Sequence, residues 1–336
     1  NTKLEIKNGG KTMENNMAIE YPMFCYQCEQ PAGGKGCTKM GVCGKTPEIA
    51  ALQDLLIFQI KGISCYAKEI VEKGENVDKD IVSFVENCLF TTLTNVNFDA
   101  DVHVELLKRS QEIKEQLRSK VGCIKNDTEH ATYNLSSTNA EMLKDAKKAG
   151  IMYDQKLDPD IRSLRQTIVY GLKGISAYGH QARELGYYDD QVDNFYIRAL
   201  EATTDDNLGV EELIRWTMRT GDMSVAVMKK LDEANTEVYS NPSPQKVNVK
   251  MKKGPFIIVS GHDLKDLEML LQQTEGKGIN IYTHGEMLPC HGYPGLKKYK
   301  HLAGNFGGAW QDQQKEFDSI PGCILMTTNC LMRPRE

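Results

Sequence analysis

Four cysteines near the start of the chain carry the clearest chemical signal in the sequence. The spacing C-x2-C-x8-C-x5-C joins Cys25, Cys28, Cys37 and Cys43, and the segment 24–44 around them also holds five glycines. Iron and sulfide are bound by thiolates that must approach one another closely, and glycine lets the backbone turn tightly enough for that. The spacing therefore predicts an iron-sulfur site, with either a 4Fe-4S or a 2Fe-2S cluster.

Two other uses of these four thiols are weaker. A structural zinc site usually shows two C-x2-C knuckles separated by a longer stretch, whereas the second pair here is spread to C-x5-C. A pair of disulfides requires an oxidising compartment, and no apolar signal segment precedes Cys25. Zinc is thus the second interpretation and disulfides the third.

A second group of metal-competent side chains lies in the last third of the chain. His262, Glu286 and Cys330 each stand just past an apolar run that predicts a strand. Each alone is more often a turn or surface residue than a ligand, but their shared placement predicts one site. Mixed nitrogen, oxygen and sulfur donors suit iron with partly open coordination. His284 is an alternative to His262, and residues 290–291, a cysteine and a histidine, could also contribute.

The elements that would position these side chains form an α/β unit. After the Pro-rich stretch 241–244, the sequence predicts a strand at 256–259, a helix at 264–273 and strands at 279–283 and 324–328. We expect a Rossmann-like parallel-sheet domain over 246–336, since such sheets bind ligands beyond the carboxyl ends of their strands. No G-x-G-x-x-G follows the first strand, so a dinucleotide site is poorly supported.

The sequence of the first two thirds of the chain predicts two copies of one helical unit. A helix start at residues 46–48, with a hydroxyl cap, a proline and a carboxylate, is repeated 112 positions later at residues 158–160. The same offset carries the Lys-Gly-Ile-Ser run at 61–64 onto residues 173–176. We expect two three-helix bundles, at 46–150 and 151–245, after an iron-sulfur loop at 23–45.

Several residues of the bundles are interpreted as structural. Gly62 and Gly174 each cost helix stability, about 1 kcal/mol, and so predict close helix packing. The remaining cysteines and histidines of this part are interpreted as ordinary core groups, with the cysteines acting as small hydrophobic side chains. These residues are Cys65, Cys88, Cys123, His103, His130 and His180.

Composition narrows the class of protein. The chain has 336 residues and a net charge of -5, which offers no basic face for nucleic acid, and no apolar run approaches the ~18 residues of a membrane span. We expect a cytoplasmic protein without membrane or nucleic-acid partners. Residues 1–22 are polar and patternless, which predicts a disordered leader before a natural start at Met23.

Taken together, the motifs resemble the hybrid-cluster proteins, also called hydroxylamine reductases, across residues 23–333. Besides the cysteine spacing, the resemblance rests on MFCYQC (23–28), LQDLLI (52–57), SGHDLKD (260–266), YTHGEMLP (282–289) and TTNC (327–330).

The resemblance implies two metal centres. Cys25, Cys28, Cys37 and Cys43 would hold a conventional cluster, of the 4Fe-4S type found in the anaerobe-type members, with 2Fe-2S as the alternative. His262, Glu286 and Cys330 would be ligands of a hybrid iron-sulfur-oxygen cluster. The family pattern implies further downstream ligands, namely three cysteines, a glutamate and a lysine, so we expect a C-terminally truncated chain with an incomplete hybrid centre.

The function that the resemblance implies is the reduction of hydroxylamine to ammonia, and also of nitric oxide to nitrous oxide. Electrons from a redox protein would enter at the N-terminal cluster, and His262 and Glu286 would be the catalytic residues. The alternative is a non-catalytic electron-transfer or redox-sensing module that loads only the N-terminal cluster. A nickel-iron carbon monoxide dehydrogenase shares the general architecture, but its motifs fit less well.

Overall fold

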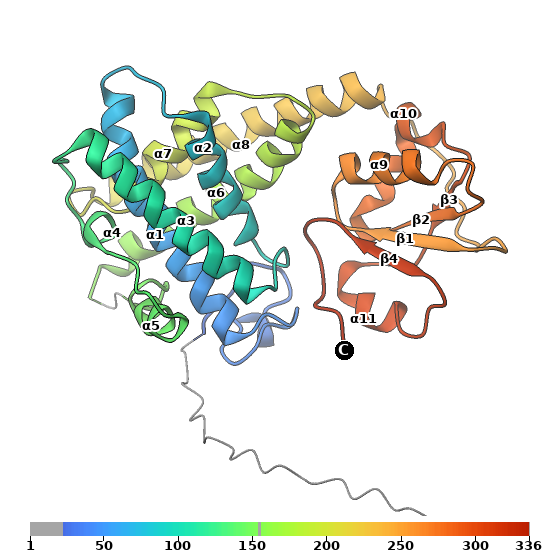
Figure 1. Cartoon of the computed structure of the whole chain (residues 1–336), viewed down its shortest axis with the longest axis horizontal. Helices are drawn as coiled ribbons and strands as arrows, with labels where there is room; N and C mark the ends of the chain where they lie inside the picture. The colour runs from blue at the N-terminus through green and yellow to red at the C-terminus, as the bar shows by residue number, and fades with distance from the viewer. Residues whose placement is uncertain (1–22, 154–155, 336) are drawn as a thin grey trace, which may run out of the picture.

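The structure is a computed structural model that describes residues 23–153 and 156–335, so the predicted leader at 1–22 lies outside it. A helical part, α1 to α8, is followed by a smaller part with a parallel sheet (Figure 1). This agrees with the predicted order of helices first and α/β structure second. No helix in the described ranges is long and apolar enough to cross a membrane.

The helical part contains two pairs of matching helices. The long helices α1 (Pro47–Glu72) and α6 (Pro159–Glu184) have 26 residues each, and α2 (Lys79–Thr91) and α7 (Asp190–Ala202) have 13 each. The predicted caps form, since Thr46 Oγ1 accepts from Ile49 N at 3.2 Å and Asp158 Oδ1 accepts from Asp160 N at 2.8 Å. Local sequence therefore places both helix starts correctly.

The other helices of this part are less regular in length. They are the 3-10 turns at Ala32–Gly34 and Ala146–Lys148, with α3 (Ala100–Val121), α4 (Glu129–Thr132), α5 (Asn139–Asp145) and α8 (Val210–Tyr239). Buried side chains from both halves, from Leu52 on α1 to Val227 on α8, form one continuous apolar core. The core gives α1 and α6 a common rigid support.

The expectations for individual helix residues have mixed outcomes. A Cβ on Gly62 would lie 2.1 Å from the carbonyl oxygen of His130, which confirms close packing there. A Cβ on Gly174 would meet nothing within 4 Å, so close packing is the wrong explanation at that position. Cys65 and Cys88 are buried as predicted, but Cys123 is exposed because it lies in the turn after α3.

The sheet has the strand order β3-β2-β1-β4, and its three pairings are parallel. The predicted strands correspond to β1 (Phe256–Ser260), β2 (Asn280–His284) and β4 (Cys323–Met326). The sequence reading missed β3 (Leu302–Asn305), which is short and contains a glycine. The connecting helices are α9 (Leu264–Thr274), Gly285–Gly292, α10 (Pro294–Lys297), Trp310–Asp312 and α11 (Gln313–Glu316).

The faces of the sheet are covered by different helices. In Figure 1, α9 and α10 lie on one side of the strands and α11 on the other. Val259 and Ile281 pack into the core with Leu267 of α9, whereas their neighbours Ile258 and Tyr282 belong to a separate cluster beside Phe317. This alternation is the period of two expected of strands buried on both faces.

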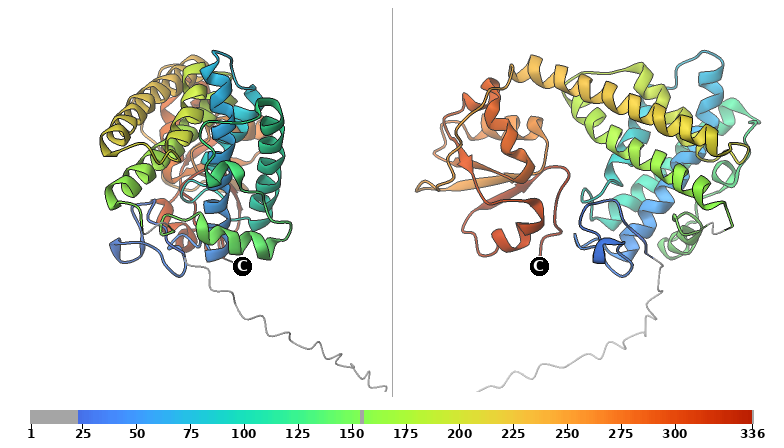
Figure 2. Two further views of the ribbon diagram at one scale, coloured as in Figure 1. Left: turned by 90° about the vertical axis from the view of Figure 1, so that its left-hand side faces the viewer. Right: turned by 180° about the vertical axis from the view of Figure 1, so that it is seen from behind.

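Two connections join the sheet to the helical part. The long helix α8 runs from one part to the other (Figure 2), and Tyr239 at its end is buried in the core beneath α9. The segment after β4 returns to the helical part. Leu331 N donates to Asn95 O, after α2, at 3.2 Å, and Arg333 N donates to Cys43 O of the cysteine loop at 2.9 Å. This return places Cys330 beside the cysteine loop.

Candidate functional site

The cysteine loop is held by its own backbone. Cys25 and Cys37 exchange two main-chain hydrogen bonds of 3.0 and 2.8 Å as an isolated antiparallel bridge. Gly44 has φ +95°, and a Cβ there would lie 2.6 Å from Cβ of Arg333. Glycine is therefore required at this position both by conformation and by the close approach of the returning chain.

The thiols of this loop are free and partly buried. All ten cysteines lie in the described ranges and none is in a disulfide, so the disulfide interpretation has no support. Burial raises the pKa of Cys43, and the neighbouring thiols of Cys25 and Cys28 raise it further. Ala32 N donates to Cys37 Sγ at 3.4 Å.

These observations bear on whether the loop fits a metal cluster. Within residues 23–153 and 156–335, no three His, Cys, Asp or Glu side chains form a ready-made metal site. The donor type fits a soft metal, since the loop offers four free thiols and the charges of Cys25 and Cys28 act on Cys43. A cation that binds thiolate would offset the burial that disfavours the charged form of Cys43.

The sheet brings the second group of predicted side chains together. His262 follows β1, and its main-chain N–H donates to Thr328 O at 2.9 Å, which ties it to the loop that carries Cys330. Burial lowers the pKa of His262 while the charge of Glu286 raises it. Burial and then the charge of Glu286 raise the pKa of Cys330 to about 11. The three groups thus follow β1, β2 and β4 at one edge of the sheet, within reach of one another's charge, but among the described residues they do not form a group close enough to hold a metal ion.

His262 is the side chain of this group that most clearly lacks a protein partner. Its Nδ1 is buried and makes no hydrogen bond with any described residue. Because burial disfavours the imidazolium, the ring is neutral near pH 7 and keeps a lone pair for a ligand. An unpaired buried nitrogen of this kind fits a metal ligand.

The backbone around Cys330 has an unusual conformation. Asn329 and Cys330 both adopt positive φ, at +64° and +52°. Gln313, which is 1% exposed, supports this loop by donating to Cys330 O and Ser260 Oγ at 3.0 Å each and by accepting from Met332 N at 2.7 Å. The sequence analysis missed Gln313, and no motif marks it, because its partners are distant in the chain.

The alternative ligands are engaged elsewhere. His284 is fully buried, with Nδ1 hydrogen-bonded to Ser260 Oγ at 3.0 Å and Nε2 paired with Glu316 Oε2 at 2.8 Å. Cys290 packs in the apolar core under α9, and burial raises the pKa of its thiol far above the usual value. The neighbouring His291 bonds Thr283 Oγ1 at 3.0 Å. In the described chain these three residues act as structural groups.

The two groups of candidate ligands adjoin each other. The charges that raise the pKa of Cys330 include those of Glu29 and Cys28, both of the cysteine loop. Cys43, Trp310 and Met332 form one small apolar cluster with Cys330 packed against it. The cysteine loop and the carboxyl ends of the strands are therefore neighbours in space. The segment after β4 contacts both of them.

The fold is that of an α/β protein in which a helical part and a four-thiol loop adjoin the strand ends of a small parallel sheet. Residues 23–336 match the family described as "Prismane/CO dehydrogenase family", and the chain belongs to that family.

Curated relatives agree with this assignment. The chain is 50% identical over 318 residues to the "Hydroxylamine reductase" of Syntrophobacter fumaroxidans, covering 94% of this chain and 58% of the relative. It is 46% identical to the protein of the same name from Desulfovibrio desulfuricans and 44% identical to that from Clostridium tetani, again over 94% of this chain and over 57% and 59% of the relatives. The chain therefore spans just under three fifths of the length of these relatives.

Proposed function

We propose that the protein to which this chain corresponds is an iron-sulfur oxidoreductase that reduces hydroxylamine. The observation that supports the proposal is the similarity of the chain to proteins named hydroxylamine reductase, together with the placement of His262, Glu286 and Cys330 at the sheet edge that adjoins the four-thiol loop. The reaction takes up two electrons and two protons, breaks the N–O bond and yields ammonia and water. Nitric oxide, reduced to nitrous oxide, is the second substrate that the resemblance suggests.

The N-terminal centre is proposed to be a 4Fe-4S cluster held by Cys25, Cys28, Cys37 and Cys43. When bound, it would supply electrons one at a time to the second centre. The chain's own contribution is to hold the loop closed through the Cys25–Cys37 backbone pair and to exclude water from Cys37 and Cys43, which are 3% and 6% exposed.

The second centre is proposed to be the hybrid iron-sulfur-oxygen cluster, with His262, Glu286 and Cys330 among its ligands. The neutral imidazole of His262 offers a lone pair, and Cys330 offers a thiolate once a cation lowers the cost of ionising it. Glu286, which is exposed in the described chain, would offer a carboxylate as the third ligand. Further ligands would come from the part of the relatives that this chain does not span.

The domain organisation is proposed to follow the repeat. Residues 46–150 and 151–245 would be duplicated three-helix bundles, supported by the equal lengths of α1 and α6 and of α2 and α7. Residues 246–336 would be the Rossmann-like part that the longer relatives continue. A small redox protein is the proposed electron donor, and the net charge of -5 argues against nucleic acid as a partner.

A second candidate is an electron-transfer or redox-sensing module that carries only the N-terminal cluster. The observation that favours it is the cysteine loop, which is closed by its own Cys25–Cys37 backbone pair. Both candidates require that cluster, and they differ in whether the second centre binds metal.

The test is anaerobic iron and acid-labile sulfide analysis with EPR on the 336-residue chain. We expect about four irons per chain, lost in Cys25→Ser and retained in Cys123→Ser, whose thiol is exposed outside the loop. Iron that persists in Cys25→Ser but is lost in Cys330→Ser would show metal at the second centre and argue against the module. In a full-length version, unchanged turnover and spectrum in Glu286→Ala would refute the proposed role of Glu286.

A further inference from the structure

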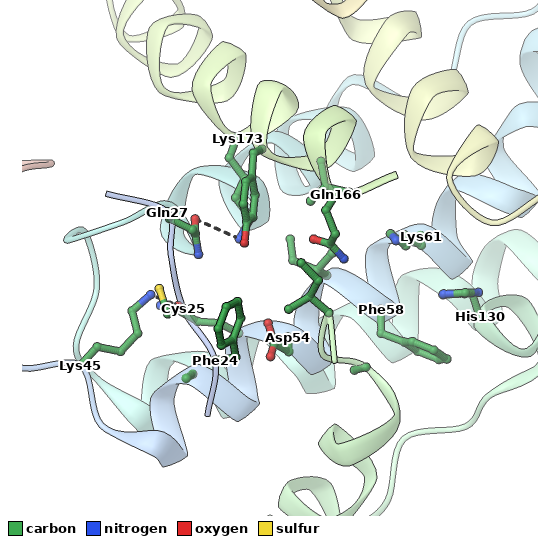
Figure 3. A pocket seen from close by; sticks show the side chains of 17 residues that line it. Phe24, Cys25, Gln27, Lys45, Asp54, Phe58, Lys61, His130, Gln166 and Lys173 are labelled. Carbon is green, nitrogen blue, oxygen red and sulfur yellow. Dashed lines mark hydrogen bonds between the residues drawn. The ribbon is translucent and has the colours of Figure 1, made fainter. Parts of the chain in front are cut away.

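The repeat of the helical part produces an internal cavity. A cavity of about 40 Å³ lies between α1 and α6, and Figure 3 shows the side chains of both helices converging on it. Positions 112 residues apart line it in pairs, so the same face of each helix meets the same space. The pairs are Asp54 and Gln166, Ile57 and Val169, Phe58 and Tyr170, and Lys61 and Lys173.

At one end of this cavity, opposite charges lie close together and Lys173 has hydrogen-bond partners. At the cysteine loop, the buried Lys173 donates to Thr92 O at 3.1 Å and to Gln27 Oε1 at 3.5 Å. The negative charge of Asp54 acts on Lys173, and the positive charges of Lys173 and Lys45 act on Asp54. The carboxylate therefore belongs to the Lys173 end, where positive and negative groups offset each other.

The other end contains polar groups without partners. Lys61 is 8% exposed and makes no hydrogen bond or ion pair within the described chain. His130 Nδ1 and Arg165 Nε are buried without a hydrogen-bond partner in that same part of the chain. The side-chain amide of Gln166, which points into the cavity in Figure 3, also lacks one there. We call these four residues the Lys61 site.

The Lys61 site lies where the inner cavity meets an outer pocket of about 350 Å³. Lys61, His130 and Gln166 line both spaces, and Arg165 lines the outer one. The outer pocket reaches solvent, since its lining includes the exposed Asp206. A small solute could thus reach Lys61 from outside.

The charges that act on His130 are positive, although Asp127 and Glu129 also line the outer pocket, where Glu129 pairs with Lys148 at 3.3 Å. After burial, the groups that lower the pKa of His130 are the cations Lys61, Arg165 and Lys114, and no carboxylate is among them. The ammonium of Lys114 is held by neutral oxygens of Gln59 and Tyr133. Arg165 pairs with Asp206, whose side chain is 79% exposed and so largely screened by water. A buried ammonium in such surroundings requires an acceptor or a counter-ion.

We propose that the Lys61 site binds a small planar oxyanion, of the class of formate, nitrite or bicarbonate. The inner cavity has room for about three water-sized groups, which limits the part that enters it to three or four heavy atoms. One oxygen of the anion would accept from Lys61, and another would accept from the Gln166 amide or the Arg165 Nε–H.

The first test uses formate, which is inert toward iron-sulfur chemistry under these conditions. Isothermal titration calorimetry of the full chain at pH 7, in chloride-free buffer, should show binding that weakens at least about tenfold in Lys61→Met. Gln166→Leu, which keeps the charge, should weaken it less. Lys68→Met is the matched control, because Lys68 is on the same helix but pairs with Glu201 at 2.9 Å, and its affinity should be unchanged.

Absence of formate binding to the unmodified chain, equal binding by Lys61→Met, or tighter binding of sulfate than of formate would each overturn the proposal. Lys61→Met should fold, since it removes an unpaired buried charge, and formate should raise the melting temperature of the unmodified chain but not of the variant. A readout independent of any variant is diffraction from formate-soaked crystals. Planar density beside Lys61 Nζ is expected, and its absence would also overturn the proposal.

Discussion

At the scale of single residues, Cys330 shows how the fold controls a reactive group. Its main chain takes a left-handed conformation, and its thiol is partly buried beside Glu286 and the cysteine loop. A bound cation would favour the thiolate there, whereas the metal-free protein disfavours it. In the metal-free protein, burial and the charge of Glu286 therefore favour the protonated thiol of Cys330.

This leads to a prediction about alkylation. With its pKa raised to about 11, only about one Cys330 thiol in a thousand is ionised at pH 8. In the metal-free chain, iodoacetamide should modify Cys330 far more slowly than the exposed Cys123, with a rate that rises about tenfold per pH unit up to the pKa. Mass spectrometry of peptides over a pH series measures both rates, and similar rates at pH 8 would contradict the burial argument.

At the scale of helices, the two glycines of the Lys-Gly-Ile-Ser repeat have different surroundings. Gly62 touches the carbonyl of His130, which lets the α4 segment lie against α1. Gly174 occupies the equivalent position on α6 and has open space where a side chain would be. Equal sequence at the two positions therefore does not mean equal packing.

Alanine substitutions should separate these two cases. Gly62→Ala should lower the free energy of unfolding by about 1–3 kcal/mol, because the new Cβ would lie 2.1 Å from a backbone oxygen. Gly174→Ala should raise it by about 0.5–1 kcal/mol, because alanine favours the helix and meets no neighbour. Urea unfolding measures both changes, and destabilisation of similar size in both variants would be inconsistent with the structure.

A buried ion cluster joins three helices of the two halves. Arg183 on α6 donates to Glu86 on α2 at 2.7 Å and to Asp193 on α7 at 2.8 Å. Tyr196 Oη also donates to Glu86, at 3.2 Å. Both carboxylate side chains are more than nine-tenths buried. Among the described residues, the guanidinium of Arg183 is the one cation that pairs with both, so it stabilises their negative charges.

Removal of the Arg183 guanidinium should lower the free energy of unfolding. Arg183→Met should reduce the free energy of unfolding by about 3–5 kcal/mol, since it leaves two buried carboxylates without their cation. The matched control is Arg215→Met, whose exposed pair with Glu212 should be worth at most about 0.5 kcal/mol. Equilibrium urea denaturation at pH 7 provides the comparison, and a loss below about 1 kcal/mol in Arg183→Met would rule out this role.

At the scale of the whole molecule, the segment after β4 couples the sheet to the cysteine loop. Leu331 and Arg333 bond the main chain of Asn95 and Cys43, and Gln313 holds the segment from the sheet side. The two candidate centres therefore share one stretch of backbone. A disturbance of this stretch should reach both.

Loss of the Gln313 amide tests this coupling. Gln313→Leu removes three hydrogen bonds and should raise amide exchange at Leu331, Met332 and Arg333 by about tenfold or more, since buried partners lose their pairing. Hydrogen-exchange mass spectrometry of the C-terminal peptide measures the effect. Gln272→Leu, on the exposed side of α9, is the control and should leave that peptide unchanged. Unaltered exchange in Gln313→Leu would show that the segment is held by other contacts.

Some features were predictable because they depend on residues only a few positions apart. The caps at Thr46 and Asp158, the lengths of the strands β1 and β2 and the spacing of the loop cysteines are all local properties. The placement of His262, Glu286 and Cys330 near one another also followed from one simple rule, that parallel strands end at the same edge of a sheet.

Tertiary structure alone decided the rest. The strand β3 exists because it pairs with β2, not because Leu-Ala-Gly-Asn favours a strand. The exposure of Cys123, the support from Gln313 and the contrast between Gly62 and Gly174 depend on neighbours far away in the chain. The residue types and spacing of this sequence determine which chemistry is available. Burial and long-range contacts determine which groups are paired and which, like the Nδ1 atoms of His130 and His262, are left without a partner in the described chain.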